Sequence, residues 1–332
     1  MDIFKYLCPL MKTIYLNQLT ETCPGSVATI GVFDGVHLGH QLVIKKVQET
    51  AKQNGLVSMV VTFDRSPRQL FDPSFRPQML TTLEEKEAII ASLGVDYLVV
   101  LPFTRELAGL SARDFMSQVL SERLNVRVLY TGYDNRFGCR KNVHLPHGEM
   151  REESFDDYVG YGKQLGMEVL RGDVELMDGG NIAVSSSVIR DMLIHDGRVD
   201  LMPHYLTRRY ALQGRVVPGE HIGHQLGYPT ANIKLTDADK LIPASGVYAV
   251  WVKLEGEQKP WAAMMNIGRR PTFDGHCQTL EVNILDFDGN LYGQTVCITF
   301  VKRLREERKF ESPEALVQQL REDKEQVTKL LI

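Results

Sequence analysis

Residues 29–41 read Thr-Ile-Gly-Val-Phe-Asp-Gly-Val-His-Leu-Gly-His-Gln, between two segments that differ in their hydrophobic pattern. Residues 27–30 form an apolar, β-branched run, which is typical of a buried strand. Residues 42–52 carry apolar side chains at helical spacing. The pattern predicts a strand–turn–helix joint, whose glycines allow the backbone to turn tightly or to approach a ligand closely.

Two histidines stand at the start of the predicted helix. His37 and His40 are three residues apart, so both imidazoles lie on one helix face, beside N–H groups that favour phosphate. Imidazoles and backbone N–H groups can stabilise the charge that builds up on a nucleotide phosphate as pyrophosphate leaves. Two such histidines can also be surface residues or a stray metal pair, but the flanking strand and helix favour a nucleotide site, to which we also assign Phe33, Asp34 and Gly35.

The overall composition limits the class of protein. A chain of 332 residues predicts two domains, and 43% hydrophobic with 24% charged residues is typical of a globular protein. The net charge of -4 argues against broad binding of nucleic acid or membranes. Five cysteines without a Cys-x-x-Cys pair argue against a disulfide framework or zinc site and fit a cytoplasmic protein. We find no signal peptide, and Met11 is an alternative start that makes the first ten residues a leader.

From residue 27 to about residue 202, strand patterns alternate with helix patterns. The candidate strands are residues 27–32, 56–63, 97–102, 126–132 and 167–170. Helices are expected to open at Thr82, Ser111 and Ser154, each followed three residues later by an acidic residue. This alternation predicts an α/β domain with a parallel sheet covered on both faces, and ligands bind beyond the carboxyl ends of its strands.

Two further loops are expected at that edge of the sheet. Residues 133–138 offer the carboxylate of Asp134, the guanidinium of Arg136 and the ring of Phe137. Residues 184–190 begin a helix with Ser185, Ser186 and Arg190, which are suited to phosphate. Taken alone, the serines favour ordinary N-capping, and Asp134 with Arg136 can equally form a surface ion pair.

After residue 206 the segments become short and β-rich. Residues 210–217, 246–252, 262–267, 280–285 and 296–302 are separated by Gly, Pro, Asn and Asp, which predicts an antiparallel barrel or sandwich. A last helix opens with Ser312 as N-cap and Pro313 as its first residue. We therefore expect one domain over residues 1–203 and a second over residues 206–332.

The second domain has its own polar cluster. A loop that contains Gly219 and Gly223 is expected to be flexible, and it is suited to covering a nucleotide. Thr230 and Asn232 share one face of an extended segment and offer hard oxygen ligands to Mg²⁺. Glu281 interrupts an apolar run, and the pattern alone favours a solvent-facing carboxylate over an inward-facing base. The chain contains no P-loop sequence.

Several motifs in the same order resemble one known family. The matching stretches are residues 31–41, 132–138, 184–190, 227–232, 266–272, 280–293 and 304–310. Over nearly its whole length the chain resembles the bacterial bifunctional riboflavin kinase/FAD synthetase family. The resemblance implies a Rossmann-like nucleotidyltransferase domain that adenylylates FMN. It also implies a riboflavin kinase domain built as a six-stranded β-barrel with a terminal helix.

The resemblance also implies roles for the residues named above. His37 and His40 would hold the ATP phosphates, with Ser185, Ser186 and Arg190 closing on the same triphosphate and Asp134, Arg136 and Phe137 at the FMN pocket. In the kinase, Thr230 and Asn232 would bind Mg²⁺ with ATP, Gly219 and Gly223 would cover the nucleotide, and Glu281 would be the base. Arg305 and Phe310 would help cover the flavin.

The expected reaction sequence has two steps. Riboflavin and ATP give FMN, and FMN with a second ATP gives FAD and pyrophosphate, each step with Mg²⁺. We expect a cytoplasmic monomer or weak homo-oligomer that acts on these small molecules without a nucleic-acid or membrane partner. The alternatives are a riboflavin kinase with an impaired adenylyltransferase domain, a non-enzymatic flavin-binding regulator and, remotely, a class I aminoacyl-tRNA synthetase.

Three positions depart from the family pattern. Ser66 replaces a histidine after the second strand, His224 stands where Arg or Lys is common, and Asn290 stands where Asp is common. The change at Ser66 is the reason for the monofunctional alternative. Arg65 or Arg68 could supply the missing positive charge.

Overall fold

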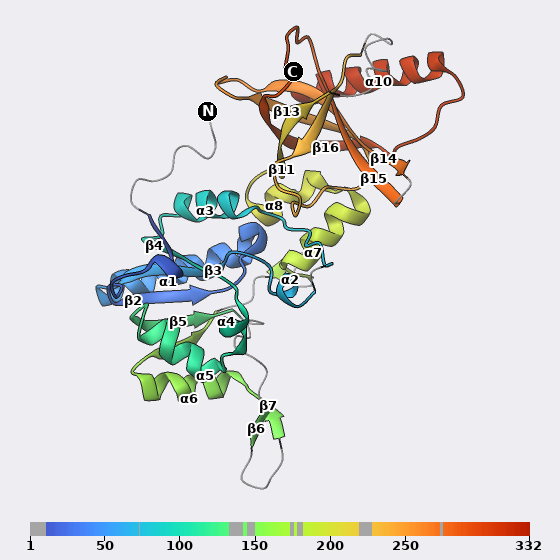
Figure 1. Ribbon diagram of the computed structural model, residues 1–332. Helices are drawn as coiled ribbons and strands as arrows, with labels where there is room; N and C mark the ends of the chain where they lie inside the picture. The colour runs from blue at the N-terminus through green and yellow to red at the C-terminus, as the bar shows by residue number, and fades with distance from the viewer. Residues whose placement is uncertain are drawn as a thin grey trace. The chain divides into compact units, whose positions relative to one another are not determined.

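The computed structural model describes residues 11–72, 74–132, 142–144, 150–172, 176–177, 182–218, 228–272 and 275–332. These residues form two compact units, shown in Figure 1. The sheet unit comprises the described residues of 11–77 and Leu83–Val184. The barrel unit comprises Gln78–Thr82 and Ser185–Ile332. The predicted leader lies outside the described residues.

The sheet unit is built on six parallel strands in the order β1-β4-β3-β2-β5-β8. Their bounds are β1 Lys12–Tyr15, β2 Ser26–Ile30, β3 Val57–Phe63, β4 Tyr97–Leu101, β5 Val126–Thr131 and β8 Glu168–Arg171. The five predicted strands are confirmed. The sequence analysis missed β1, a four-residue edge strand with one buried side chain, because it lacks the apolar run of the others.

Both faces of this sheet are covered by helices, as a doubly wound fold requires (Figure 1). Val27 and Val60 point to the face that α1 (Leu38–Asn54) and α3 (Leu83–Ser92) cover. Their neighbours Ala28 and Met59 point to the face covered by α5 (Ala112–Phe115), the π-helical turn Met116–Ser121 and α6 (Phe155–Leu165). Strands buried on both faces explain why their sequences are apolar throughout.

Helix starts follow the predicted caps. The amide N–H of Asp114 donates to Ser111 Oγ at 3.1 Å, and that of Ser154 donates to Asp157 Oδ2 at 2.7 Å. The third predicted helix, α3, begins directly after Thr82. The smaller elements are the 3₁₀ turns Leu16–Gln18 and Asp34–Val36, α2 Pro67–Phe71, α4 Arg105–Gly109, the antiparallel pair β6 Asn142–His144 and β7 Met150–Glu152, and the antiparallel pair β9 Leu176–Met177 and β10 Ile182–Ala183.

The position of β2 decides where a ligand can bind. From β2 the chain proceeds to β3 on one side and, after β4, returns to β5 on the other. In open parallel sheets a crevice forms at such a reversal, beyond the carboxyl ends of the strands. The loop that follows β2 is the histidine stretch singled out from the sequence.

The barrel unit is a closed antiparallel barrel in the order β11-β12-β15-β14-β13-β16. Its strands are β11 Ala211–Val217, β12 Ala231–Leu235, β13 Gly246–Leu254, β14 Trp261–Thr272, β15 Gly275–Ile284 and β16 Thr295–Arg305. The barrel is confirmed and the sandwich alternative is excluded. The last helix, α10 (Pro313–Leu331), starts as predicted, because Ser312 Oγ accepts the Ala315 N–H at 3.2 Å, and its Val327 packs on the barrel core.

A short helical segment precedes the barrel and packs within the same unit. It contains α7 (Ser186–Asp191), the π-helical turn Met192–Asp196, the 3₁₀ turn Val199–Leu201 and α8 (Met202–Leu206). The Ala244 N–H donates to the Leu193 carbonyl at 2.8 Å, and Arg303 Nη1 donates to the Asp196 carbonyl at 3.4 Å. This segment therefore belongs to the same compact unit as the barrel. The functional domain limits 1–203 and 206–332 remain a prediction.

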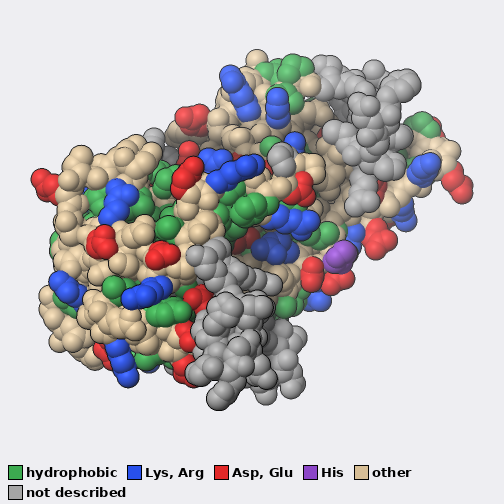
Figure 2. Space-filling model, turned by 60° about the horizontal axis from the view of Figure 1, so that its bottom comes forward, with side chains coloured by type: hydrophobic (Ala, Val, Ile, Leu, Met, Phe, Trp, Pro, Cys, Tyr) green, Lys and Arg blue, Asp and Glu red, His purple; other side chains and the backbone are tan. Residues whose placement is uncertain are grey.

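Charge is mixed on the one face of the molecule that a space-filling view shows (Figure 2). Figure 2 shows one face, on which the Lys and Arg side chains of the described residues are interspersed with Asp and Glu. Within the described ranges, no helix is both long enough and apolar enough to cross a membrane.

Candidate functional sites

The loop after β2 has an unusual backbone. Phe33, Gly35 and Val36 have φ angles of 50°, 80° and 39°, in the left-handed region. A β-branched residue such as Val36 rarely adopts this conformation. The side chains of Phe33 and Val36 are buried in a core cluster with Val60 and Ile90, which holds the loop in place. Backbone strain that packing maintains is typical of a functional site.

His37 and His40 lie on one helix face, as the sequence predicted. His37 Nδ1 accepts the N–H of His40 at 3.4 Å, so His37 is the N-cap of α1. The two imidazoles are stacked with ring centroids 3.6 Å apart, and the Phe33 ring packs edge-on against His40 at 5.0 Å. The structure thus brings three predicted site residues together at one helix N-terminus.

The environment of His40 keeps its imidazole neutral. Burial, together with the charges of His37 and Lys86, lowers the pKa of His40 well below its ordinary value of 6.5. Its Nδ1 atom is buried and has no hydrogen-bond partner among the described residues. Buried polar atoms are nearly always paired in folded proteins, so this nitrogen is suited to a ligand group.

Lys86 on α3 is a cation that the sequence analysis missed. Its side chain is 3% exposed, and its Nζ donates to Thr62 Oγ1 at 3.3 Å. Burial lowers the pKa of Lys86 to about 8, against the opposing effects of Asp34, Glu87 and Asp64. Its spacing of four residues from the buried Ile90 was the signal that could have placed it on the inner helix face.

Ser185, Ser186 and Arg190 stand at the start of α7. Ser185 Oγ accepts the Val188 N–H at 3.3 Å, which is the N-cap that the pattern favoured, and Arg190 Nη1 donates to Ser187 Oγ at 3.5 Å. Their proposed contact with phosphate stays a prediction. The flavin residues predicted from residues 133–138, namely Asp134, Arg136 and Phe137, lie outside the described residues.

The loop that carries Ser66 forms the start of α2. The Ser66 N–H donates to Gln69 Oε1 at 3.1 Å, so serine acts here as a helix N-cap. Arg65 pairs with Asp64 at 3.2 Å, and the Arg68 guanidinium lies 4.2 Å from the ring centre of Phe75. Both arginines that could replace the family's histidine are thus engaged with other groups.

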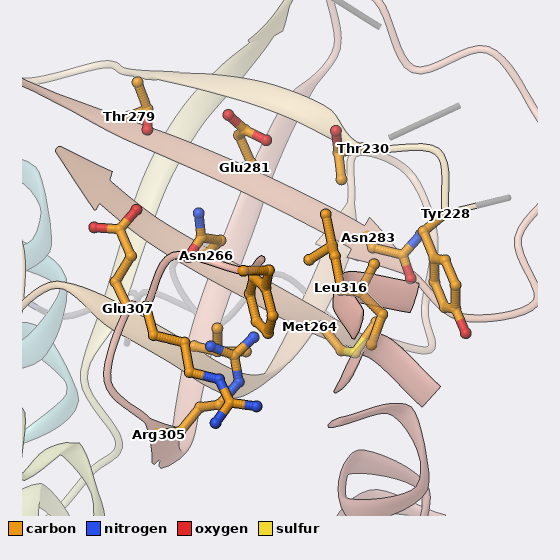
Figure 3. A pocket seen from close by; sticks show the side chains of 14 residues that line it. Tyr228, Thr230, Met264, Asn266, Thr279, Glu281, Asn283, Arg305, Glu307 and Leu316 are labelled. Atoms are coloured by element: carbon orange, nitrogen blue, oxygen red, sulfur yellow. The ribbon is translucent and has the colours of Figure 1, made fainter. Parts of the chain in front are cut away.

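The barrel unit contains a cavity of about 360 Å³. Polar side chains on its wall come from β14, from β15 and from the end of β16 with the segment that follows it, and apolar side chains come chiefly from β13, β14 and α10 (Figure 3). The lining residues are Tyr228, Thr230, Val247, Met264, Asn266, Thr279, Glu281, Asn283, Arg305, Glu307, Arg308, Phe310, Leu316 and Leu320.

Glu281 faces this cavity, so the solvent-facing orientation favoured by the pattern alone was wrong. In Figure 3 its carboxylate lies between Thr279 and Thr230. Glu281 is directly opposite Asn232 on β12 and Asn266 on β14. Side chains at directly opposed positions of antiparallel strands point to the same side of the sheet. The three residues therefore form one polar row across β12, β15 and β14.

Three cavity residues on these strands were missed as site residues. Thr279 and Asn283 stand two residues before and after Glu281, and Asn266 is opposite it. Asn283 Nδ2 donates to the Pro229 carbonyl at 2.8 Å, which fixes the chain just before Thr230. The period of two along β15 was the signal that could have found Thr279 and Asn283.

Arg305 and Phe310 both line the cavity, and their contact with the flavin stays a prediction. A charged network ties them to α10. Arg305 donates to Asp323 from Nε at 3.1 Å and from Nη2 at 2.8 Å. Gln319 Nε2 donates to Asp323 at 3.0 Å, and Gln319 Oε1 accepts from Arg308. The guanidinium groups of Arg305 and Arg308 lie 5.7 and 5.0 Å from the ring centre of Phe310.

The remaining predicted residues of the second half lie elsewhere. Gly219, Gly223 and His224 are outside the described residues. Asn290 is exposed in the loop between β15 and β16, where its Oδ1 accepts the Tyr292 N–H at 3.0 Å. Asn290 is not among the described residues that line the cavity, so its difference from the family pattern lies in a turn rather than in the cavity wall.

A parallel sheet with a histidine loop at its reversal point, joined to a closed barrel with a carboxylate in its cavity, defines a two-module transferase that acts on nucleotide phosphates. Comparison with family models matches residues 206–331 to riboflavin kinase and residues 19–187 to FAD synthetase. The chain belongs to the bifunctional riboflavin kinase/FMN adenylyltransferase family, which confirms the resemblance seen in its motifs.

Individual relatives cover nearly the whole chain. A bifunctional riboflavin kinase/FMN adenylyltransferase of Pseudomonas fluorescens is 37% identical over 91% of each chain, and that of Escherichia coli K12 is 36% identical over 90% of each. The Bacillus subtilis protein of the same name is 34% identical over 95% of this chain and 97% of its own. A crystal structure from Streptococcus pneumoniae, described as a macrolide-efflux protein, has a TM-score of 0.81 at 30% identity and covers 96% of this chain and 99% of its own.

Proposed function

We propose that the barrel unit phosphorylates riboflavin to FMN with ATP, and that the sheet unit adenylylates FMN to FAD with release of pyrophosphate. The observation that carries the proposal is the position of Glu281, a carboxylate in a cavity wall and in register with Asn232 and Asn266. A binding protein needs no such base, which argues against the regulator alternative. The family matches in both halves support the two activities together.

In the kinase step, Glu281 accepts the proton of the terminal ribityl hydroxyl. The hydroxyl oxygen then forms a bond to the γ-phosphorus of ATP, the bond between that phosphorus and the β,γ-bridging oxygen breaks, and ADP leaves. The apolar and aromatic part of the cavity wall, which includes Met264, Leu316 and Phe310, suits the flat flavin ring. Positioning the hydroxyl between base and phosphate supplies much of the rate increase.

Thr230 and Asn232 would hold Mg²⁺ together with the phosphates of ATP. A hydroxyl and an amide oxygen are hard oxygen donors of the kind that this ion prefers, and Asn232 lies opposite Glu281, the proposed base. When bound, Mg²⁺ neutralises phosphate charge and orients the γ-phosphate. The contact of Asn283 with the Pro229 carbonyl places Thr230 beside the cavity for this role.

In the adenylyl transfer step, an FMN phosphate oxygen attacks the α-phosphorus of ATP. A bond forms between them, the bond to the β-phosphate oxygen breaks, and pyrophosphate leaves. His37, His40 and the N–H groups at the start of α1 stabilise the charge on the phosphate oxygens. We assign Ser185, Ser186 and Arg190 to the triphosphate and Asp134, Arg136 and Phe137 to FMN.

We further propose a cytoplasmic protein, monomeric or weakly associated, whose partners are riboflavin, FMN and ATP rather than nucleic acid. The net charge of -4 and the cysteine pattern support this assignment.

Chromatography of the products from riboflavin, ATP and Mg²⁺, sampled over time, tests the two activities. We expect FMN to rise first and then to give way to FAD. FMN that accumulates without FAD would instead indicate a riboflavin kinase with an impaired first domain, the alternative raised by Ser66. Absence of both products would contradict the proposal.

A further inference from the structure

We propose that Lys86 is a positioning residue for adenylyl transfer, a buried cation beneath the histidine loop that holds the loop through Thr62 and supplies positive charge where phosphate binds. The inference rests on the function proposed for the sheet unit.

The contact between Lys86 and the loop passes through one side chain. Lys86 Nζ donates to Thr62 Oγ1 at 3.3 Å, and Thr62 Oγ1 donates in turn to the carbonyl of Val32 at 3.1 Å. Thr62 has no exposed surface and stands near the end of β3, while Val32 directly precedes Phe33, the first strained residue of the loop. The ammonium group is therefore connected to the backbone that positions Phe33 and the two histidines.

Burial of a lysine at this place has a high cost. Lys86 is 3% exposed in a helix that packs on an apolar core, where an uncharged side chain of similar length would avoid the desolvation of an ammonium group. The charged groups that act on Lys86 are Asp34 in the loop, Asp64 after β3 and Glu87 on its own helix. A buried charge among these groups indicates an electrostatic role in addition to packing.

The charge of Lys86 acts on the site in two ways. Water screens this buried charge only weakly, and it offsets the negative charges of Asp34, Asp64 and Glu87, which would otherwise repel the phosphates that the loop and the α1 N-terminus are built to hold. It also disfavours protonation of His40, because two nearby cations repel each other. His40 then meets the substrate as a neutral imidazole with one donor and one acceptor nitrogen.

Three variants test the charge of Lys86 separately from its hydrogen-bonded connection to the loop. Lys86→Met removes the charge at similar length, Lys86→Arg keeps a charge, and Thr62→Val keeps the charge but removes the hydroxyl that connects it to Val32. Lys45→Met on the exposed side of α1 is the matched control. We expect Lys86→Met to lower kcat for FMN adenylylation about tenfold or more at neutral pH. Riboflavin phosphorylation in the same preparation and the Lys45→Met variant should stay at wild-type rates.

The pH profile gives a readout that packing alone would not change. Because the pKa of Lys86 is about 8, its charge is lost as the pH rises through that value, and wild-type adenylylation should fall there. Lys86→Arg should abolish this fall, because a guanidinium keeps its charge well above this range. Thr62→Val should be slower than wild type but should keep the fall.

The titration of His40, followed by its imidazole proton resonance and assigned with His40→Gln, gives a second readout. Its pKa should rise in Lys86→Met and stay unchanged in Lys45→Met. Wild-type kinetics and an unchanged His40 titration in Lys86→Met would overturn the inference. If Lys86→Met fails to fold, the pH profile of Lys86→Arg and the rate of Thr62→Val test the inference in its place. A wild-type pH profile in Lys86→Arg together with a wild-type rate in Thr62→Val would overturn it. A wild-type enzyme that makes no FAD from FMN would instead contradict the proposed function itself.

Discussion

Arg305 at the end of β16 and Asp323 on α10 form a two-point ion pair, with Nε and Nη2 of the arginine 3.1 and 2.8 Å from the two carboxylate oxygens. Asp323 has no exposed surface, and the Arg305 side chain is 18% exposed. The pair joins the strand that lines the cavity to the terminal helix, and Gln319 extends it toward Arg308. The same contacts orient the two arginines that flank Phe310.

The first prediction concerns this pair. Asp323→Ala leaves Arg305 without its carboxylate, so we expect the barrel unit to lose about 3 kcal/mol of unfolding free energy. The KM for riboflavin should rise, because the wall formed by Arg305 and Phe310 loses its support. Denaturant unfolding and riboflavin phosphorylation kinetics measure both effects.

Lys324→Ala is the matched control. Lys324 is also on α10 and forms an exposed ion pair with Asp286, just after β15, which is expected to contribute less than about 1 kcal/mol. Equal stability and equal KM in the two variants would show that the buried pair has no such role.

The second prediction separates the two activities. Glu281→Gln keeps the size of the side chain but removes the base, so riboflavin phosphorylation should fall about a hundredfold or more. FMN added directly should still be converted to FAD at the wild-type rate. The control is Glu255→Gln, an exposed carboxylate directly after β13. Loss of both activities in Glu281→Gln would argue against separate sites.

The third prediction separates the two roles of His37. His37→Ala removes both the imidazole and the N-cap of α1, so it should abolish FAD formation and lower stability by about 1 kcal/mol. His37→Asn restores a good N-cap without the imidazole, and should recover the stability but not the activity. Thermal unfolding and FMN adenylylation are the measurements. Full activity in His37→Asn would limit His37 to a capping role.

The fourth prediction follows from the burial of His40. Because its pKa in the folded state lies well below the ordinary value of 6.5, the unfolded chain binds the proton more readily. The free energy of unfolding should therefore be unaffected by His40 above pH 6.5 and should fall as the pH decreases below it. The slope contributed by His40 can reach about 1.4 kcal/mol per pH unit.

Two variants test this slope by denaturant unfolding between neutral and mildly acidic pH. His40→Gln should remove the contribution, whereas His195→Gln, at an exposed position, should keep it. An unchanged slope in His40→Gln would show that other groups cause the acid sensitivity.

Much of the fold could be predicted from local sequence signals. Ser111, Ser154 and Ser312 mark helix starts in the structure as in the sequence, because a cap depends only on residues three positions away. The strands of the sheet were found from their apolar runs. The exception was β1, whose Lys12 and Tyr15 are exposed at the edge of the sheet, so its sequence carries no clear strand pattern.

The site residues also differ in whether local sequence could predict their contacts. His37 and His40 could be placed together from their spacing, since neighbours three positions apart on a helix always share a face. Lys86 could not be connected to Thr62 in this way, because they are 24 positions apart and meet only when α3 packs on the sheet. Glu281 was assigned to solvent by its pattern, because the sequence does not show which side of a strand a barrel encloses.

By itself, the sequence determined the α/β class of the first half, the β-rich class of the second, the helix caps and the histidine loop, since these follow from side chains within a few residues of each other. Only the tertiary structure decided that Glu281 faces the cavity opposite Asn232 and Asn266, and that Arg305 meets Asp323. Those contacts depend on strand register and on the packing of α10. Both are set by burial over the whole unit rather than by local sequence.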